Sequence, residues 1–162
     1  MNTLLLGMGN PILCDDAVGI RLARFMSPRL SHAPQLSCTP TIMEECSVGG
    51  LNILEIITGY EQLIILDSIK TSGASPGKWY RFTAQSLKET MNLNNVHDAN
   101  FASALELGRR IGLPLPIDEN IHIFAVEVLD NITFSEVMSP PLEIGFPEYA
   151  EEIFTEIYQL LS

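Results

Sequence analysis

The sequence is poor in cysteine. It holds three cysteines, Cys14, Cys38 and Cys46, an odd number without the paired spacing of zinc-binding motifs. This pattern excludes a disulfide framework and gives no indication of a cysteine-based metal site. We expect reduced thiols and a cytoplasmic location.

Positive charge is also scarce, since 9 Lys and Arg stand against 20 Asp and Glu and give a formal net charge of −11. This charge opposes broad contact with phosphate backbones or anionic lipid, so we expect neither nucleic acid nor a membrane as partner. No Lys or Arg follows Arg110, whereas ten acidic residues do. The acidic C-terminal third is either a solvated surface or a field that steers a basic peptide or a cation.

Long hydrophobic runs are absent as well. The apolar run near the N-terminus ends by Gly9 and has no basic residues before it, so it indicates neither a signal peptide nor a membrane span. Hydrophobic residues still make up 46% of the chain and charged residues 18%, which excludes disorder. A chain of 162 residues is about one domain with a real core. We expect a single domain over residues 1–162 and a monomer.

The order of hydrophobic patterns predicts an α/β fold. A short apolar run over residues 3–8 predicts a strand, and an i, i+3/i+4 pattern from Val18 to Met26 predicts the helix after it. Four consecutive aliphatic residues before Asp67 predict a strand covered on both faces, in the middle of a parallel sheet. We expect further strands at 36–43, at 78–83 near an edge and at 121–128, and helices at 47–58, at 99–111 with Asp98 as N-cap, and at 146–161.

Candidate functional residues lie where loops leave strands, which is where open α/β sheets bind ligands. Residues 7–16, Gly-Met-Gly-Asn-Pro-Ile-Leu-Cys-Asp-Asp, begin like a dinucleotide fingerprint but have Ile12 in place of the third small residue. Asp15 and Asp16 follow near the N-terminus of the first helix, where they would repel a phosphate group and attract a cation. Asp is also a common structural choice at a helix start, so both interpretations stay open.

Asp67 and His97 are also expected where loops leave strands. A carboxylate directly after a buried strand must find a partner, a metal or water, and structure and function are equally open for it. His97 precedes a predicted helix, either as a surface histidine or with its ring in the crevice. Together with Asp16 these residues could offer two carboxylates and one imidazole, a set that suits nickel, zinc or manganese with positions open for substrate. His122, within an apolar strand, is interpreted as a satisfied core histidine.

The sequence around Asp16, Asp67 and His97 resembles that of a known family, the nickel-iron hydrogenase maturation proteases. The resemblance is sharpest over residues 4–21, which are similar to the family's first strand, its loop of the pattern G-x-G-N-P-x-x-x-D-D/E-x-x-G, and its first helix. An aliphatic strand ending in Asp67 and a histidine before a helix, His97, are two further family elements. The resemblance implies a three-layer sandwich of the phosphorylase/hydrolase-like kind, with a central, mostly parallel twisted sheet and helices on both faces.

The resemblance also implies an activity. Proteins of this family remove the C-terminal extension of a hydrogenase large-subunit precursor after nickel has been inserted into it. Asp16, Asp67 and His97 match the family's metal-binding acid, Asp and His, which would contact nickel carried by the precursor. Other divalent ions could occupy the same site. Asp16 and Asp67 are therefore the expected catalytic carboxylates of a metal-dependent, aspartic-type endopeptidase.

A second loop is expected to bind the substrate through Glu45, Gly49 and Gly50. The family usually has an acid followed by glycines and Thr there, whereas this chain reads Glu-Cys-Ser-Val-Gly-Gly over residues 45–50. Cys14 likewise replaces a commoner Gly or Thr. Two mechanisms are open: nickel of the substrate polarises the carbonyl and activates water, or a carboxylate of the aspartate pair is the general base. Two other functions are a non-catalytic nickel-dependent checkpoint or chaperone for the large subunit, and a nucleotide-binding enzyme.

Overall fold

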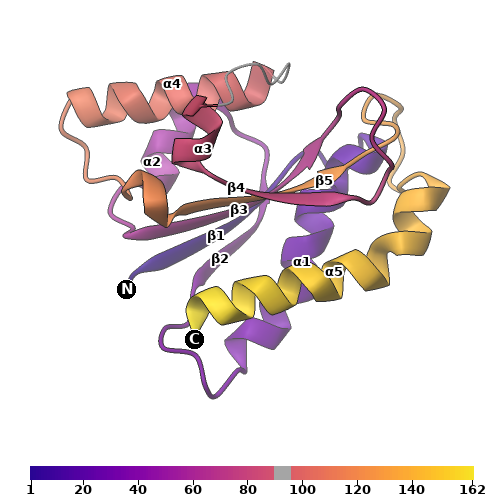
Figure 1. The fold of residues 1–162 in the computed structure, drawn as a ribbon, viewed down its shortest axis with the longest axis horizontal. Coiled ribbons are helices and arrows are strands. Elements are labelled where there is room, and N and C mark those ends of the chain that lie inside the picture. The colour runs from indigo at the N-terminus through magenta and orange to yellow at the C-terminus, as the bar shows by residue number, and fades with distance from the viewer. Residues whose placement is uncertain (90–95) are drawn as a thin grey trace.

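The computed structural model describes residues 1–89 and 96–162, and the side chains of residues 1–86 and 100–162 (Figure 1). The strands are β1 (Thr3–Met8), β2 (Thr41–Cys46), β3 (Gln62–Ile69), β4 (Trp79–Thr83) and β5 (Ile121–Glu127). The α-helices are α1 (Val18–Ser31), α2 (Ile53–Ile57), α3 (Ala84–Glu89), α4 (Val96–Arg110) and α5 (Pro140–Leu161). Short 3-10 helices are η1 (Cys14–Ala17), η2 (Gly50–Asn52) and η3 (Asp118–Asn120).

The strands form one mixed sheet in the order β2-β1-β3-β5-β4. β1 pairs in parallel with β2 and β3, and β3 pairs in parallel with β5. β4 pairs with β5 in the antiparallel direction and forms one edge. The predicted central position of β3 and the edge position of β4 are both confirmed. The carboxyl ends of β1, β2, β3 and β5 therefore meet at one end of the sheet.

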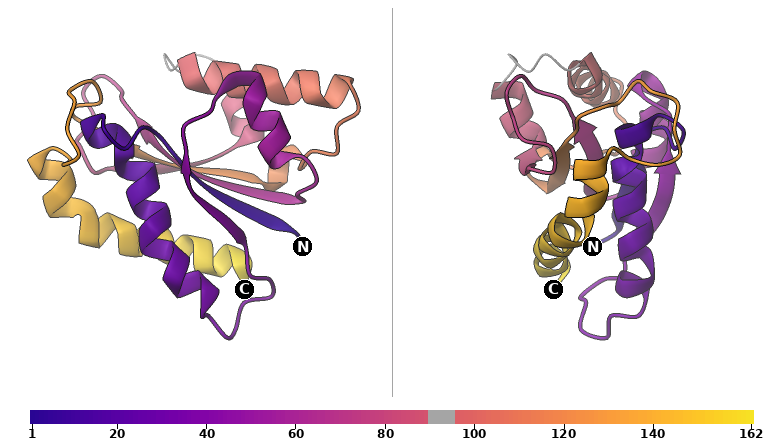
Figure 2. Two further views of the ribbon diagram at one scale, coloured as in Figure 1. Left: turned by 180° about the vertical axis from the view of Figure 1, so that it is seen from behind. Right: turned by 90° about the vertical axis from the view of Figure 1, so that its right-hand side faces the viewer.

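Helices cover both faces of the sheet, as Figures 1 and 2 show. α1 and α5 pack against one face, where Leu66 and Phe124 belong to the buried core. α2, α3 and α4 pack against the other face, where Leu63 and Ile123 lie in a second buried core. Neighbouring residues of β3 thus point to opposite cores, which is why this strand is aliphatic at consecutive positions. The expected three-layer α/β sandwich is confirmed.

Several predicted boundaries were wrong. The strand expected at 36–43 is β2, Thr41–Cys46, and the helix expected at 47–58 is reduced to η2 and the five-residue α2. α4 begins no later than Val96, so Asp98 lies within the helix and is not its N-cap. α5 begins at Pro140, six residues before the predicted start. Two prolines fit its first turn because the N–H groups there have no partner inside the helix. α3 was not predicted.

Arginines from other elements pair with several acids of the acidic C-terminal third. The pairs are Arg21–Glu143, Arg29–Glu151, Arg81–Glu156 and Arg109–Asp118, with N–O distances of 2.6–3.2 Å. These pairs neutralise part of the negative field, which favours the interpretation of a solvated, ion-paired surface over one that steers ligands. Within the described ranges, no helix is both long and apolar enough to cross a membrane.

Candidate functional site

A cavity of about 400 Å³ lies at the carboxyl ends of the strands. Its lining comes from the loop after β1, from η1, from the segment between β2 and α2, and from the second half of β3. Ile123 of β5, Asn131 in the loop after β5, and Asn100 and Phe101 of α4 complete it. Such a crevice is where α/β sheets of this kind bind ligands. Asp16, Asp67, Gly49 and Gly50, four of the predicted site residues, are among the lining residues.

Asp16 is held at the cavity by the loop that carries the glycine pattern. Its Oδ2 accepts a hydrogen bond from the backbone N–H of Asn10 at 2.9 Å. Gly9 has φ +135°, and a Cβ there would lie 2.0 Å from the Asp16 carbonyl oxygen. A side chain at position 9 would therefore push η1 away from the loop. This close approach explains why the second glycine of the fingerprint-like pattern, Gly9, is needed even without a bound nucleotide.

Gly19 has a similar role at the start of α1. A Cβ at this position would lie 2.2 Å from the Leu66 carbonyl oxygen and 2.5 Å from that of Met8. Only glycine lets the helix pack this closely on the ends of β1 and β3. The contact brings η1, which carries Asp16, against the end of the strand that carries Asp67.

Asp67 is half-buried and lies within β3, which runs on to Ile69, so the prediction that Asp67 follows the strand was wrong. Its Oδ1 accepts the backbone N–H of Ser68 at 2.7 Å. The Ser68 hydroxyl donates to Asp16 Oδ1 at 3.0 Å. Ser68 thus contacts both acids and fixes their relative position, although they are 51 residues apart in the sequence. Sequence reasoning missed Ser68, because its role depends on this contact and no motif marks it.

The backbone of His97 lies within α4, so the prediction that His97 precedes the helix was wrong. Its side chain lies outside the described part of the structure. Asn100 and Phe101, one turn further along α4, line the cavity. The helix start is thus directed to the same site as Asp16 and Asp67. Among the described side chains, no group of three His, Cys, Asp or Glu residues is close enough to hold a metal ion. The metal set of two aspartates and His97 stays a prediction.

The structure does not bring Glu45 to the cavity. Its Oε2 accepts a hydrogen bond from Arg24 Nη2 at 2.8 Å, and both side chains are almost half exposed. Side chains alternate along a strand, so the next residue of β2, Cys46, points inward while Glu45 points away from the lining. Gly49 and Gly50 lie at the cavity as expected, and their role in substrate binding stays a prediction.

Cys46 is a buried thiol in the cavity lining. Burial raises the pKa of the Cys46 thiol, and the charge of nearby Asp67 raises it further. A thiol of raised pKa is protonated at neutral pH and is a poor nucleophile. The cavity therefore offers carboxylates, not a thiolate, for chemistry. Lys70, the residue after β3, is the only Lys or Arg among the described lining residues.

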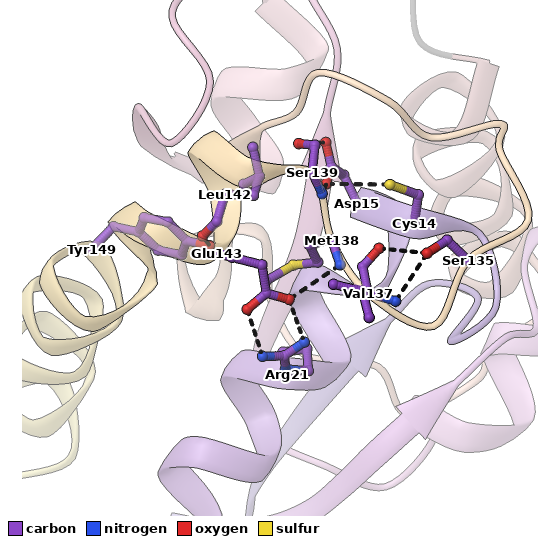
Figure 3. A network of polar contacts seen from close by, with 10 residues as sticks. All are labelled: Cys14, Asp15, Arg21, Ser135, Val137, Met138, Ser139, Leu142, Glu143 and Tyr149. Carbon is purple, nitrogen blue, oxygen red and sulfur yellow. Dashed lines mark hydrogen bonds and ion pairs between the residues drawn. The ribbon is translucent and has the colours of Figure 1, made fainter.

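Asp15 has a different role from its neighbour. Its side chain is fully buried and accepts hydrogen bonds from four donors of the loop between β5 and α5, two of them from Ser139, which Figure 3 draws beside Asp15. The donors are Leu129 N at 3.0 Å, Asp130 N at 2.9 Å, Ser139 N at 2.6 Å and Ser139 Oγ at 2.7 Å. The sequence left a structural role and a cation-binding role open for both acids. In the structure Asp15 has the structural role, whereas Asp16 lines the cavity.

His122 is buried in β5, as predicted, but the interpretation that its hydrogen bonds are satisfied was wrong. Within the described residues its Nδ1 has no hydrogen-bond partner. Burial lowers the pKa of His122, and the charge of Arg81 lowers it further. The neutral ring packs in the core and lies outside the cavity lining.

The fold and the cavity define an α/β protein with paired carboxylates at the carboxyl ends of its strands. A family model described as hydrogenase maturation protease matches residues 40–154, most of the chain. The chain therefore belongs to the hydrogenase maturation protease family. This match does not include residues 4–21, where the resemblance is sharpest. A comparison with curated proteins gave no match.

Solved structures of hydrogenase maturation proteases share the fold. The hydrogenase maturating endopeptidase HybD from E. coli superposes with a TM-score of 0.74 at 21% identity, over 98% of this chain and 93% of that one. The NiFe hydrogenase maturation protease HybD from Thermococcus kodakarensis gives 0.70 at 19% identity, over 98% and 99%. HycI from the same organism gives 0.63 at 20%, over 99% and 92%. At these identities the likeness shows the fold alone.

Proposed function

We propose that the protein is an endopeptidase that removes the C-terminal extension of a nickel-iron hydrogenase large-subunit precursor after nickel insertion. The observation that carries the proposal is the placement of Asp16 and Asp67 at one cavity, with Ser68 in contact with both. Membership of the protease family and the position of the cavity at the strand ends support it. The unpaired cysteines agree with a reducing compartment, and we propose the cytoplasm.

The chemistry available to the chain is that of carboxylates. Asp16 and Asp67 would contact nickel carried by the precursor, together with His97, which is one turn before the cavity-lining Asn100 and Phe101 on the same helix. Oxygen and imidazole ligands of this kind suit nickel and other divalent ions. The precursor brings the ion, so it is part of the substrate. Bound there, nickel would hold the scissile peptide bond beside the two aspartates.

Hydrolysis then requires a water molecule and a place for its proton. In one route a carboxylate of the pair takes the proton as the water oxygen bonds to the carbonyl carbon, and the proton passes to the leaving amine. In the other route nickel of the substrate polarises the carbonyl and activates the water. Ser68 acts in both routes as a positioning residue, because its hydroxyl and N–H orient the two carboxylates. The high pKa of the Cys46 thiol opposes a cysteine-protease route.

The test is cleavage of nickel-loaded precursor by Asp16→Asn, Asp67→Asn and His97→Ala, followed by mass spectrometry of the large subunit. We expect each variant to slow cleavage by about 100-fold or more, the contribution typical of a positioned acid or base. Matched controls are Glu119→Gln, an exposed acid at the other end of the sheet, and the exposed His32→Ala. Both should cleave at the wild-type rate.

Two results would contradict the proposal. Full cleavage by Asp16→Asn and Asp67→Asn would remove the carboxylates from the mechanism. Wild-type protein that binds the nickel-loaded precursor without changing its mass would instead indicate the non-catalytic checkpoint.

A further inference from the structure

Large apolar side chains are exposed on two neighbouring segments beside the cavity. We call them the apolar rim: Ile12, Leu129, Ile132, Phe134 and Val137, with exposed fractions of 45%, 51%, 77%, 79% and 63%. They are five of the thirteen large hydrophobic residues that are exposed in the described part of the chain. Four of the five lie within nine consecutive residues of the loop between β5 and α5. Four large apolar side chains exposed within nine residues differ from singly scattered surface hydrophobics, and they make this loop the candidate interaction surface.

The loop that carries the apolar rim is fixed by hydrogen bonds (Figure 3). Ser135 pairs with the segment before η1, since its N–H donates to the Ile12 carbonyl and its carbonyl accepts the Cys14 N–H, both at 2.9 Å. The Asp130 carboxylate accepts the N–H groups of Ile132 and Thr133 at 3.1 and 3.0 Å. These backbone groups have their partners inside the chain, while the apolar side chains of the rim are exposed. Their exposure to water is unfavourable unless a partner covers them.

The apolar rim borders the cavity. Leu13, next to Ile12, and Asn131, next to Ile132, both line it. Figure 2 shows the loop after β5 beside η1, the element that carries Asp16. A polypeptide that enters the cavity therefore has the rest of its own protein beside the apolar rim. The charged residues of 129–137 are Asp130 and Glu136, a composition that fits an apolar interface centre with a polar margin.

The size of the cavity shows why such a surface is needed. A cavity of about 400 Å³ has the volume of a small-molecule site. A sphere of that volume has a surface of only about 260 Å², whereas a stable contact between two proteins buries roughly 800 Å² on each partner. Most of the contact with a protein substrate must therefore lie outside the cavity, around its mouth.

We propose that the apolar rim docks the folded body of the large-subunit precursor while its tail occupies the cavity. This inference rests on the proposed function. A second copy of the chain is the less suitable occupant, because a dimer formed there would lie across the mouth that the tail must pass. The apolar rim thus determines how well the precursor binds, and Asp16 and Asp67 carry out the cleavage.

The experiment measures KM and kcat with nickel-loaded, folded precursor for the double variant Ile132→Ser/Phe134→Ser. We expect KM to rise about tenfold or more, as for loss of a buried aromatic anchor, with kcat at saturation unchanged within about twofold. The single variant Phe134→Leu keeps an apolar side chain at this position, so it should retain most of the wild-type affinity for the precursor. Ile111→Ser is the matched control, because Ile111 is 64% exposed at the far end of α4. It should leave both constants unchanged, and the Tm of all variants should equal that of the wild type.

The two proposals fail differently. If the wild type cleaves the precursor and the double variant has the KM of Ile111→Ser, the apolar rim is not a docking surface, while the protease function stands. If the wild type leaves nickel-loaded precursor uncut, the proposed function itself fails. A wild-type dimer in sedimentation velocity that the double variant converts to monomer, with KM unchanged, would assign the surface to a second copy and overturn the inference.

Discussion

Replacing Asp15 by Asn should destabilise the fold without any change in the cavity lining. The carboxyl group is fully buried and is the acceptor for four donors of the loop between β5 and α5. Three of them, Leu129 N, Asp130 N and Ser139 Oγ, share Oδ2, and Ser139 N is bound to Oδ1. An asparagine can keep its oxygen on the three, but its NH₂ group then faces the Ser139 N–H. Two donors would be opposed and one hydrogen bond lost.

The magnitude follows from the type of bond. A hydrogen bond to a charged acceptor contributes about 1.5–3 kcal/mol, and leaving a buried donor unsatisfied costs about 1–3 kcal/mol. The terms are not additive within one network, so we expect Asp15→Asn to lower the free energy of unfolding by about 2–4 kcal/mol. For a chain of this size that corresponds to a fall in Tm of about 5–15 °C.

The assay is thermal and urea unfolding of three variants in parallel. Asp15→Asn should show the full loss. Glu136→Gln, an exposed acid on the same loop, should unfold like the wild type. Asp16→Asn removes the adjacent acid, which is only half-buried and accepts two hydrogen bonds, so its loss of stability should be smaller. A Tm for Asp15→Asn within about 1 °C of the wild type would refute the structural role that we assign to this carboxyl group.

Two further predictions concern pH and are checked by urea unfolding. Burial and Arg81 lower the pKa of His122, so below about pH 6.5 the unfolded chain takes up a proton that the folded chain does not, and stability falls. His122→Leu should remove that pH dependence and raise stability by about 1 kcal/mol at pH 7, since it eliminates a buried Nδ1 that has no partner among the described residues. An unchanged slope between pH 7 and 5.5 would contradict this. Arg21 holds the pKa of Glu143 below its usual value, so the pair stabilises the fold above about pH 4.5 and this contribution is lost as pH falls through the depressed value. Glu143→Gln should cost about 0.5–1 kcal/mol at pH 7 and less at pH 3.5, whereas an equal cost at both would count against the pair.

The parts of the fold that could be predicted are those that local patterns determine. The aliphatic run before Asp67 is short, uninterrupted and followed by a charge, and only a central strand satisfies all three features. The start of α5 could not be found in this way, because Pro140, Gly145 and Pro147 are all typical helix breakers. The fold accepts them because Leu142 and Tyr149 are buried against the sheet. Packing between distant segments overrides local preference there.

The candidate site, like the fold, could be predicted only in part. Asp16 comes after β1 and Asp67 lies near the carboxyl end of β3. These strand ends must meet in a parallel sheet, so the proximity of the two acids follows from the order of elements. Glu45 was assigned from its match to a family position, in a loop after the strand predicted at 36–43. β2 instead runs to Cys46, and within this strand Glu45 faces away from the cavity. Ser68 depends on a contact across 52 residues, between Ser68 and Asp16. Only the folded chain reveals such a contact.

The two adjacent acids show how the fold connects substrate docking to chemistry. Consecutive residues of a 3-10 helix point about 120° apart, so Asp15 and Asp16 on η1 must face different surroundings. Asp15 is bonded to the loop that carries the apolar rim, and Asp16 is bonded to Ser68 beside Asp67. One short turn therefore sets the distance between the proposed docking surface and the proposed catalytic acids. A precursor seated on that surface would meet the aspartates at a fixed separation, which positions the scissile bond before any chemistry begins.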